Sequence, residues 1–244
     1  MNKTLKAEIL FSLIVITIIC VSSCKKDKTP IRTQLNACLN YGEISDLDGN
    51  KYATIKIDNQ VWMAENLRTL RYSNGDTIPN IKESWLWLRL KNGAWSNYNN
   101  DPNLDALHGK LYNWYAVKDS RNICPKGWHI PNDNEWGALI IALGGSNIAG
   151  LKMKSTLDNI WATQYDGVSY NVQRTNESGF SALASGMRSI DASFLLKTYS
   201  GSFWSTTEYN GGSAYFRELF WNGNGVGRYN DNKYRGFSCR CIKD

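Results

Sequence analysis

The chain contains 244 residues and carries a formal net charge of +6 at pH 7. Its basic residues are dispersed, and no run of adjacent Lys or Arg is longer than Lys25-Lys26. Because nucleic-acid-binding proteins concentrate positive charge on one face, this distribution argues against a nucleic-acid partner. The length is enough for one sizeable hydrophobic core.

Residues 1–23 predict a secretory signal peptide. Lys3 and Lys6 precede an apolar segment that is shorter than the roughly 20 residues of a membrane-spanning helix. Small residues then lead to Cys24, an arrangement that resembles a bacterial lipoprotein signal. We therefore expect lipid on Cys24 and a polar, flexible tether over residues 24–40. The alternative is an ordinary signal peptide with an incidental cysteine.

Residues 46–67 predict a β-hairpin at the start of the folded domain. Polar and apolar residues alternate over residues 52–57, and residues 60–63 form the returning strand. Asp58-Asn59 between them suits a two-residue turn.

Three residues before this hairpin have side-chain oxygens of the kind that bind calcium: Asp46, Asp48 and Asn50. An EF-hand loop that started at Asp46 would need Gly at its sixth position and Glu at its twelfth. The chain has Lys51 and Ile57 there, so calcium is unsupported and we expect a turn with solvated acids. The sequence predicts no metal and no other cofactor.

Residues 133–143 predict the main helix. Four apolar residues recur with helical spacing: Trp136, Leu139, Ile140 and Leu143. Asn132 and Glu135 form an Asn-x-x-Glu capping box at its start. A second helix is predicted over residues 109–117 and one helical turn over residues 149–154. Residues 68–108 lack periodicity and predict a long loop region that aromatic side chains hold in place.

From Gly179 onward the pattern predicts short strands separated by turns rich in Gly, Asn and Asp. The predicted strands cover residues 180–183, 194–198, 202–207, 214–221, 225–229 and 236–242. Two helices followed by a run of antiparallel strands indicate an α+β fold.

Four cysteines remain once Cys20 leaves with the signal and Cys24 takes the lipid: Cys38, Cys124, Cys239 and Cys241. An even number in an exported protein predicts a disulfide framework. Cys239 and Cys241 would share one face of a strand, which places them poorly for a bond with each other. Each is therefore expected to bond a distant partner, and two pairings remain open on this argument.

Seven segments carry a resemblance to a known family. They are Asp48-Gly-Asn, Gln60-Val-Trp-Met-Ala-Glu-Asn-Leu67, Gly109-Lys-Leu-Tyr-Asn-Trp-Tyr-Ala116, Cys124-Pro-Lys-Gly-Trp-His-Ile-Pro131 with Glu135-Trp136, Gly179-Phe-Ser-Ala-Leu183, Phe203-Trp-Ser-Thr-Thr207 and Gly236-Phe-Ser-Cys-Arg-Cys241. Together they resemble the Fibrobacter succinogenes major paralogous domain, in family order across residues 41–244. We take that range as the domain.

More distantly, the Pro-x-x-x-Glu-Trp helix start and the Gly-Phe-x-x-Arg ending are similar to the sulfatase-modifying, formylglycine-generating-enzyme domain. That domain is a variant of the C-type-lectin-like fold. The resemblance implies a compact, irregular, disulfide-stapled α+β domain with two helices packed on short twisted antiparallel strands.

The resemblance also bears on the disulfides. The family ending usually has an aliphatic residue where Cys239 stands here. This implies that Cys124–Cys241 is the common bond and that Cys38–Cys239 is an additional one.

The strongest enzymatic candidate is the Cys239-x-Cys241 pair. Formylglycine-generating enzymes use a C-terminal cysteine pair, and two neighbouring thiolates can bind copper(I). Their pair has a wider spacing, however, and disulfides account for both cysteines here. His108 and His129 lack zinc-site spacing, and no Gly-x-Ser-x-Gly motif marks a nucleophile. We expect no catalytic residue and a structural role for His129 at the helix start.

Ten tryptophans and thirteen tyrosines are more than one core of this size needs. Aromatic rings beside amides and carboxylates suit sugars, whose apolar faces stack while their hydroxyls form hydrogen bonds. In the fold that the chain resembles, ligand sites lie in long loops. The expected ligand-binding residues are Trp85, Trp87, Trp95, Asn99, Asn100, Asp101, Trp221, Asn222, Asn224 and Asp231. Trp114, Trp128, Trp136 and Trp204 are expected in the core.

Three functions remain open at this stage. The favoured one is a non-catalytic extracellular domain that binds glycan, and the second is a structural or adhesive module that contacts other extracellular proteins. The third is an oxidoreductase that uses Cys239 and Cys241. In each case we expect an outer-membrane lipoprotein of the cell envelope, attached through its lipid and facing either the cell surface or the periplasm.

Overall fold

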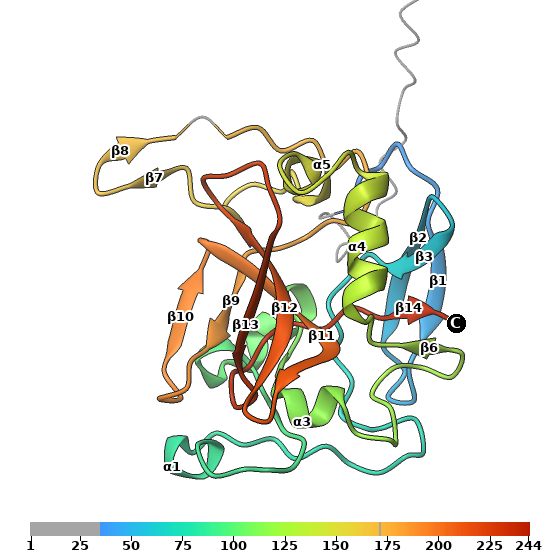
Figure 1. Ribbon diagram of the computed structural model, residues 1–244, viewed down its shortest axis with the longest axis vertical. Helices are drawn as coiled ribbons and strands as arrows, with labels where there is room; N and C mark the ends of the chain where they lie inside the picture. Colours follow the sequence, from blue (N-terminus) through green and yellow to red (C-terminus); the bar gives the residue numbers. More distant parts are fainter. Residues whose placement is uncertain (1–34, 171) are drawn as a thin grey trace, which may run out of the picture.

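The computed structural model describes residues 35–170 and 172–244. The predicted signal peptide, Cys24 and residues 25–34 of the predicted tether lie outside the described residues. Two five-stranded sheets flank the helix α4 (Asp133–Ala142), which packs between them (Figure 1). Within the described ranges, no helix has the length and apolar character that a bilayer crossing requires.

The first sheet joins the predicted hairpin to the C-terminus, in the order β1-β2-β3-β14-β6. Its strands are β1 (Gly42–Ser45), β2 (Lys51–Ile57), β3 (Gln60–Met63), β6 (Trp128–His129) and β14 (Ile242–Lys243). The hairpin prediction is confirmed, because β2 and β3 pair antiparallel with Ile57 opposite Gln60. Asp58 in the turn has a φ of 51°, a left-handed conformation that Asp and Asn adopt in tight turns.

The acidic residues before this hairpin hold a turn. The Asp46 carboxylate accepts hydrogen bonds from the backbone N–H groups of Asp48 and Asn50 (2.9 Å each) and from the Tyr52 hydroxyl (2.6 Å). The Asp48 carboxylate accepts from the Leu70 N–H (2.6 Å). These bonds tie the turn to the segment that follows the hairpin.

The second sheet has the order β10-β9-β11-β12-β13. Its strands are β9 (Ser185–Arg188), β10 (Phe194–Lys197), β11 (Ser200–Asn210), β12 (Ser213–Phe220) and β13 (Gly227–Asn232). Strands predicted over residues 194–198, 202–207 and 214–221 are confirmed, and the one predicted over 225–229 is shifted toward the C-terminus. The strand predicted over 180–183 is wrong, because that stretch makes only the isolated bridge between Ala182 and Lys154.

Short ladders and short helices complete the fold. The ladders are β4 (Trp95–Ser96) with β5 (Leu111–Tyr112), and β7 (Gln164–Tyr165) with β8 (Val168–Ser169). The remaining α-helices are α1 (Ser84–Trp87), α2 (Asp105–His108), α3 (Trp114–Val117) and α5 (Ala149–Met153). Two 3-10 turns are η1 (Tyr98–Asn100) and η2 (Pro102–Leu104).

The helix predicted over residues 109–117 is wrong for most of its length. Tyr112 exchanges two backbone hydrogen bonds with Phe237 (2.9 and 3.1 Å), so this part of the chain is extended as β5. Only α3 remains helical, and the Asn113 side chain caps it. The domain is therefore a β-rich α+β fold with one main helix instead of two. The helical turn predicted at 149–154 is confirmed by α5.

Helix α4 starts where the capping box predicts. Asn132 Oδ1 accepts from the Glu135 N–H (3.0 Å), and Glu135 Oε2 accepts from the Asn132 N–H (2.8 Å). His129 bridges this helix start to the C-terminus through Glu135 Oε1 (2.9 Å) and Asp244 Oδ1 (2.6 Å). Burial lowers the pKa of His129, but these two hydrogen bonds outweigh it and raise that pKa overall. The structural role predicted for His129 is confirmed.

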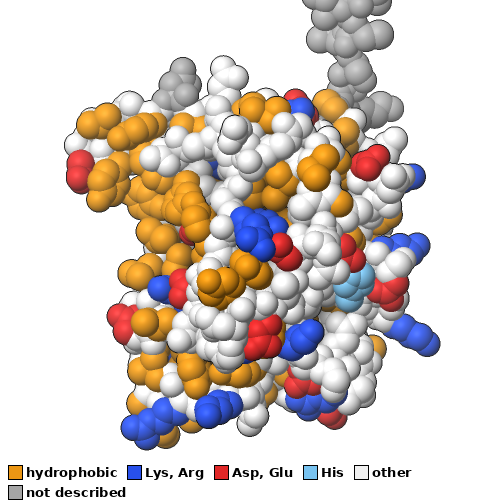
Figure 2. Space-filling view, viewed as in Figure 1, with side chains coloured by type: hydrophobic (Ala, Val, Ile, Leu, Met, Phe, Trp, Pro, Cys, Tyr) orange, Lys and Arg blue, Asp and Glu red, His pale blue; other side chains and the backbone are white. Residues whose placement is uncertain are grey.

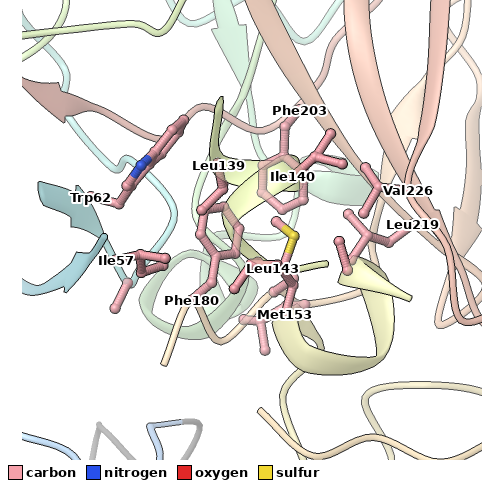
Figure 3. Packing of buried hydrophobic residues seen from close by; sticks show 14 of the residues in the cluster. Ile57, Trp62, Leu139, Ile140, Leu143, Met153, Phe180, Phe203, Leu219 and Val226 are labelled. Carbon is pink, nitrogen blue, oxygen red and sulfur yellow. The ribbon is translucent and has the colours of Figure 1, made fainter. Parts of the chain in front are cut away.

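The main hydrophobic core forms around α4. Trp136, Leu139 and Ile140 on the helix are buried against both sheets. Figure 3 shows Trp62 of the first sheet on one side of Leu139, and Phe203 and Leu219 of the second sheet on the other. The four tryptophans predicted in the core, Trp114, Trp128, Trp136 and Trp204, are all buried. Leu35 and Leu39, at the end of the predicted tether, also pack against this core.

A fully buried cation, Arg240, lies against the core rings of Phe180 and Phe203. Its guanidinium donates to Asn66 Oδ1 (2.7 Å) and to the carbonyls of Met63 (3.0 Å), Phe180 (2.7 Å) and Ser181 (3.1 Å). Burial lowers the pKa of Arg240 to about 9, so the side chain is still charged at neutral pH. The hydrogen bonds offset the cost of burying this charge.

One of the two predicted disulfides is confirmed. Cys124 and Cys241 are bonded, with 6.0 Å between their Cα atoms, and the bond ties the segment before β6 to the last strand. The predicted Cys38–Cys239 bond is wrong, because Cys38 lies exposed while Cys239 is fully buried. Cys239 packs in the same hydrophobic cluster as the disulfide and behaves there as a small apolar residue.

Replacement of a bridged cysteine tests the Cys124–Cys241 bond. We expect Cys124→Ser to lower the free energy of unfolding by about 2–5 kcal/mol, the usual loss for a native disulfide. Thermal and urea unfolding under oxidising conditions measure the change. Cys241→Ser and the double variant serve as controls and should lose a similar amount, because each removes the same bond. An unchanged melting temperature in Cys124→Ser would contradict the pairing.

Candidate functional site

Exposure singles out one tryptophan. Nine of the ten tryptophans in the chain are buried, whereas Trp85 is 63% exposed. An exposed indole is costly to leave in water, and tryptophan is enriched where proteins bind ligands. Trp85 is therefore the residue around which we build the candidate site.

Trp85 lies on α1, inside a loop whose two ends meet. The Trp95 N–H donates to the Pro79 carbonyl (3.0 Å), and the Ile81 N–H donates to the Trp95 carbonyl (3.0 Å). Residues 80–94 are thus closed at their base, as in the compact surface loops called Ω-loops, which are frequently functional. We call residues 80–94 the Ω-loop.

Two buried indoles hold the Ω-loop to the domain. Trp87, on α1, donates its indole N–H to the Tyr234 carbonyl (2.7 Å), and Trp95 donates to the Ile78 carbonyl (2.9 Å). Both side chains are buried, so neither ring is available as the ligand platform that the sequence predicted. They fix the loop that presents Trp85.

A buried arginine of the second sheet, Arg188, fixes the Ω-loop from beneath. It donates to the carbonyls of Ile81 (2.5 Å) and Lys82 (2.9 Å) at the start of the loop. Its guanidinium also lies 4.2 Å from the ring centroid of Trp87, a favourable cation–π arrangement. Burial lowers the pKa of Arg188 to about 10, which leaves it charged at neutral pH.

Arg188 was not among the residues predicted from sequence. The signal that could have found it is a lone arginine directly after a stretch of small and apolar residues, 180–187.

Asn113 holds the far end of the Ω-loop, and Gly93 allows this part of the chain to pack closely. Asn113 Oδ1 accepts from the Ala94 N–H (3.0 Å), and its amide group donates to the Asn92 carbonyl (2.9 Å). A Cβ atom at Gly93 would lie 2.0 Å from the Tyr72 hydroxyl, so only glycine fits. With both ends and the middle fixed, the loop presents Trp85 in a preorganised position.

The predicted residues 99–101 lie on a neighbouring turn. Asn99 and Asn100 both adopt a left-handed backbone (φ 52° and 56°), and Asp101 caps η2 by accepting from the Asn103 N–H (2.9 Å). A stack of rings connects this turn to the Ω-loop. Tyr98 packs 5.4 Å from Phe194, and Arg188 lies 5.1 Å from the same Phe194 ring.

The other predicted ligand residues lie elsewhere. Trp221 follows β12 and is buried beneath Tyr170 (4.7 Å between ring centroids) and Tyr199 (5.8 Å), so its ring is not available for stacking. Asn222 and Asn224 are exposed in the turn that follows. Asp231 on β13 forms an ion pair with Arg235 (2.5 Å). The structure therefore does not bring the ten predicted residues together into one site.

Among the described cysteine and histidine side chains, those of Cys239, Cys241 and His108 are bonded or buried. Cys241 is in the disulfide, and burial raises the pKa of the Cys239 thiol well above its usual value, which disfavours the reactive thiolate. His108 is buried beside Ser185 (3.3 Å), and burial lowers its pKa to about 4. In residues 35–170 and 172–244, no group of three or more His, Cys, Asp or Glu side chains is placed to hold a metal ion.

Comparison with known proteins gives one match. The family model of the Fibrobacter succinogenes major domain matches residues 55–243. Neither the curated proteins nor the solved structures contain a match to this chain. The likeness to the formylglycine-generating-enzyme domain and to the C-type-lectin-like fold stays a prediction.

Substitution of Arg188 tests how the Ω-loop is held. We expect Arg188→Met to lower the free energy of unfolding by about 2–5 kcal/mol, because the buried Ala192 carbonyl and the partly buried carbonyls of Ile81 and Lys82 lose a charged donor. Hydrogen exchange at the Ile81 and Trp95 amides should accelerate more than exchange in β11 and β12.

The matched control for Arg188→Met is Arg121→Met. Arg121 is 40% exposed and pairs with Asp76 and Asp119 at the surface, so its loss should cost less than about 1 kcal/mol. Equal losses of unfolding free energy from the two substitutions would show that Arg188 does not hold the Ω-loop.

Proposed function

The chain belongs to the Fibrobacter succinogenes major domain family, and for this member we propose an exported, lipid-anchored envelope protein whose domain binds glycan without catalysis. The observation that carries the proposal is the exposure of Trp85 on a loop that four buried side chains fix in place. The loop provides a flat apolar ring in a defined orientation, which is what a sugar ring requires for stacking.

The surroundings of Trp85 support glycan as the ligand. Sugar rings present apolar C–H faces to an indole while their hydroxyls reach polar groups beside it. The Ω-loop offers such groups at its exposed positions, which are Lys82, Glu83, Ser84, Arg89, Lys91 and Asn92. Since Trp87 and Trp95 hold the loop, binding needs no ordering of the backbone, and the entropic cost of association stays low.

A non-catalytic role is supported by the state of the cysteines. An oxidoreductase of the kind considered from the sequence needs two thiols at Cys239 and Cys241. Cys241 is bonded to Cys124, and Cys239 is buried with a raised pKa. Neither side chain is then available as a thiolate at the surface.

The anchor and the location are proposed from the sequence. Lys3, Lys6, the apolar segment that follows and the small residues before Cys24 support lipidation at Cys24. We propose an outer-membrane lipoprotein that faces the cell surface or the periplasm. No helix among residues 35–170 and 172–244 is suited to cross a membrane.

A second candidate, a module that contacts other proteins, is favoured by a separate surface. Exposed apolar side chains gather around the β7–β8 hairpin and β10. Figure 2 shows hydrophobic side chains down the left side of the molecule, where these strands lie. The exposed apolar residues of this surface are Tyr165, Val168, Tyr170, Leu195 and Leu196. Contiguous apolar patches of this kind often mark contact surfaces.

Trp85 provides the test of glycan binding. The purified protein is screened on a glycan array, and the affinity for any bound glycan is then measured by calorimetry. We expect Trp85→Ala to weaken binding by about tenfold or more, equivalent to about 1.4 kcal/mol, because the stacking surface is lost.

Tyr209→Ala is the control for Trp85→Ala. Tyr209 is another exposed aromatic residue, at the end of β11, and its replacement should leave the affinity unchanged. If the unaltered protein binds no glycan on the array, or if Trp85→Ala binds as tightly as the unaltered protein, the proposal fails.

Cys24→Ala tests the lipid anchor. In cells fed a labelled fatty acid, we expect the unaltered protein to carry label and to fractionate with membranes. Cys24→Ala should lose the label, because the thiol that takes the lipid is gone. Cys20→Ala, within the predicted signal, should keep it. Labelled Cys24→Ala protein would contradict the lipoprotein assignment.

A further inference from the structure

The Ω-loop that carries Trp85 also carries three basic side chains: Lys82, Arg89 and Lys91. All three are exposed. Within the described chain none of them forms an ion pair, although ion pairs occupy many basic residues elsewhere on the domain. Glu83 is the one acidic residue of the loop. Figure 2 shows basic side chains beside hydrophobic ones at the end of the molecule that carries α1.

A fourth cation lies beneath this surface. The guanidinium of Arg188 is buried and bonds the carbonyls of Ile81 and Lys82, next to the exposed cations. Its direct contacts are carbonyl oxygens and aromatic rings, and among the described residues it forms no ion pair. The Glu83 carboxylate acts on it from a greater distance and partly offsets its charge. Since a buried charge is screened less than an exposed one, Arg188 adds to the positive potential around Trp85.

We infer that the glycan bound at Trp85 is acidic, a polymer of carboxylated sugars. This inference rests on the proposed function and adds the class of ligand. The sugar ring stacks on the Trp85 indole while its carboxylates lie near Lys82, Arg89 and Lys91. Stacking contributes affinity for the ring, and the unpaired cations contribute selectivity for the charge.

A second surface with exposed aromatic rings lies around Trp221, and its composition differs from that of the Ω-loop. Around Trp221 the exposed rings are Tyr165 and Tyr170, and the polar neighbours Asn222 and Asn224 are uncharged. A buried cation, Lys154, donates to the carbonyls of Phe220 and Gly223 on either side of Trp221, so the two surfaces differ in their exposed cations and not in the buried one. The charge around Trp85 is therefore a property of the Ω-loop and not of aromatic residues in this domain generally.

The position of the Ω-loop favours a glycan over the protein's own membrane. Helix α1 lies at the opposite end of the domain from the point where the described chain begins (Figure 1). A domain attached through residues that precede Leu35 would direct α1 away from the bilayer that holds its lipid. The loop is then placed to meet a polymer outside that bilayer.

The experiment compares two forms of one polymer. Polygalacturonate carries a carboxylate on every sugar, and its fully methyl-esterified form has the same backbone without the charge. We expect the purified protein to bind polygalacturonate about tenfold more tightly, the gain that three exposed ion pairs of ordinary strength give together. Raising the ionic strength from about 0.01 M to about 1 M shortens the Debye length from about 30 Å to about 3 Å and should abolish the difference.

Two triple variants distinguish the effect of the Ω-loop cations on binding from the effect of the overall net charge. Lys82→Gln/Arg89→Gln/Lys91→Gln should bind both polymers equally, at the affinity of the unaltered protein for the ester. The matched control, Lys118→Gln/Lys126→Gln/Lys243→Gln, removes as many exposed cations from other surfaces and should keep the preference for polygalacturonate. Trp85→Ala should weaken binding to both polymers.

Several outcomes would overturn the inference. Equal binding of the two polymers by the unaltered protein removes the acidic ligand and leaves the proposed glycan function in place. Loss of the preference in the control triple variant assigns it to net charge instead of the Ω-loop. Polyglutamate binding as tight as that of polygalacturonate, and insensitive to Trp85→Ala, assigns the loop to an acidic peptide. Absence of binding to either polymer and to a glycan array overturns the proposed function as well.

Discussion

The buried guanidinium of Arg240 connects segments of the chain that are far apart in sequence. It donates to Met63 at the end of β3 and to Asn66 after it, and to Phe180 and Ser181 before β9. Each of these oxygens would otherwise be buried without a donor, at a cost of about 1–3 kcal/mol apiece. The neighbouring Cys241 adds a covalent bond to Cys124. The last strand is thereby fixed between β3 and β6, and the first sheet is complete.

Arg188 applies the same chemistry beneath the surface that we propose for ligand binding. Like Arg240 it is fully buried, lies against aromatic rings and bonds backbone carbonyls of irregular chain. An irregular loop has many carbonyls that no strand or helix partner satisfies, and a guanidinium can donate to several at once. This explains how a domain with so little regular helix holds its loops in place. It also explains why the Ω-loop can present a large exposed ring such as Trp85.

Most tryptophans of this domain are part of its framework. Nine buried indoles fix strands and loops, and several donate their N–H to a backbone carbonyl, as Trp87 and Trp204 do. A high aromatic content is therefore mostly structural in this chain. Function is better sought where the pattern is broken, at the single exposed indole, than in the total number of rings.

Local sequence determined the features that depend on neighbouring residues. The β2–β3 hairpin follows from alternation and an Asp-Asn turn, and α4 follows from its apolar spacing and its capping box. The Cys124–Cys241 bond and the family were predicted from motifs in a fixed order. The hairpin and the helix need no knowledge of distant contacts, because hydrogen bonds between residues a few positions apart specify them. The disulfide joins residues that are 117 positions apart, and its prediction followed from the family resemblance instead.

Only the tertiary structure decided the features that depend on distant partners. Residues 111–112 have helical spacing, yet they form a strand because Phe237 pairs with Tyr112. Trp85, Trp87 and Trp95 look equivalent in sequence, but their exposure differs because of their tertiary contacts. Arg188 and the Tyr234 carbonyl, both distant in sequence, lie against Trp87, and Lys110 lies over the ring of Trp95. Cys38 and Cys239 satisfy the parity argument but lie in different environments. Burial is a property of the whole fold, so the sequence predicted the type of site and the structure selected Trp85.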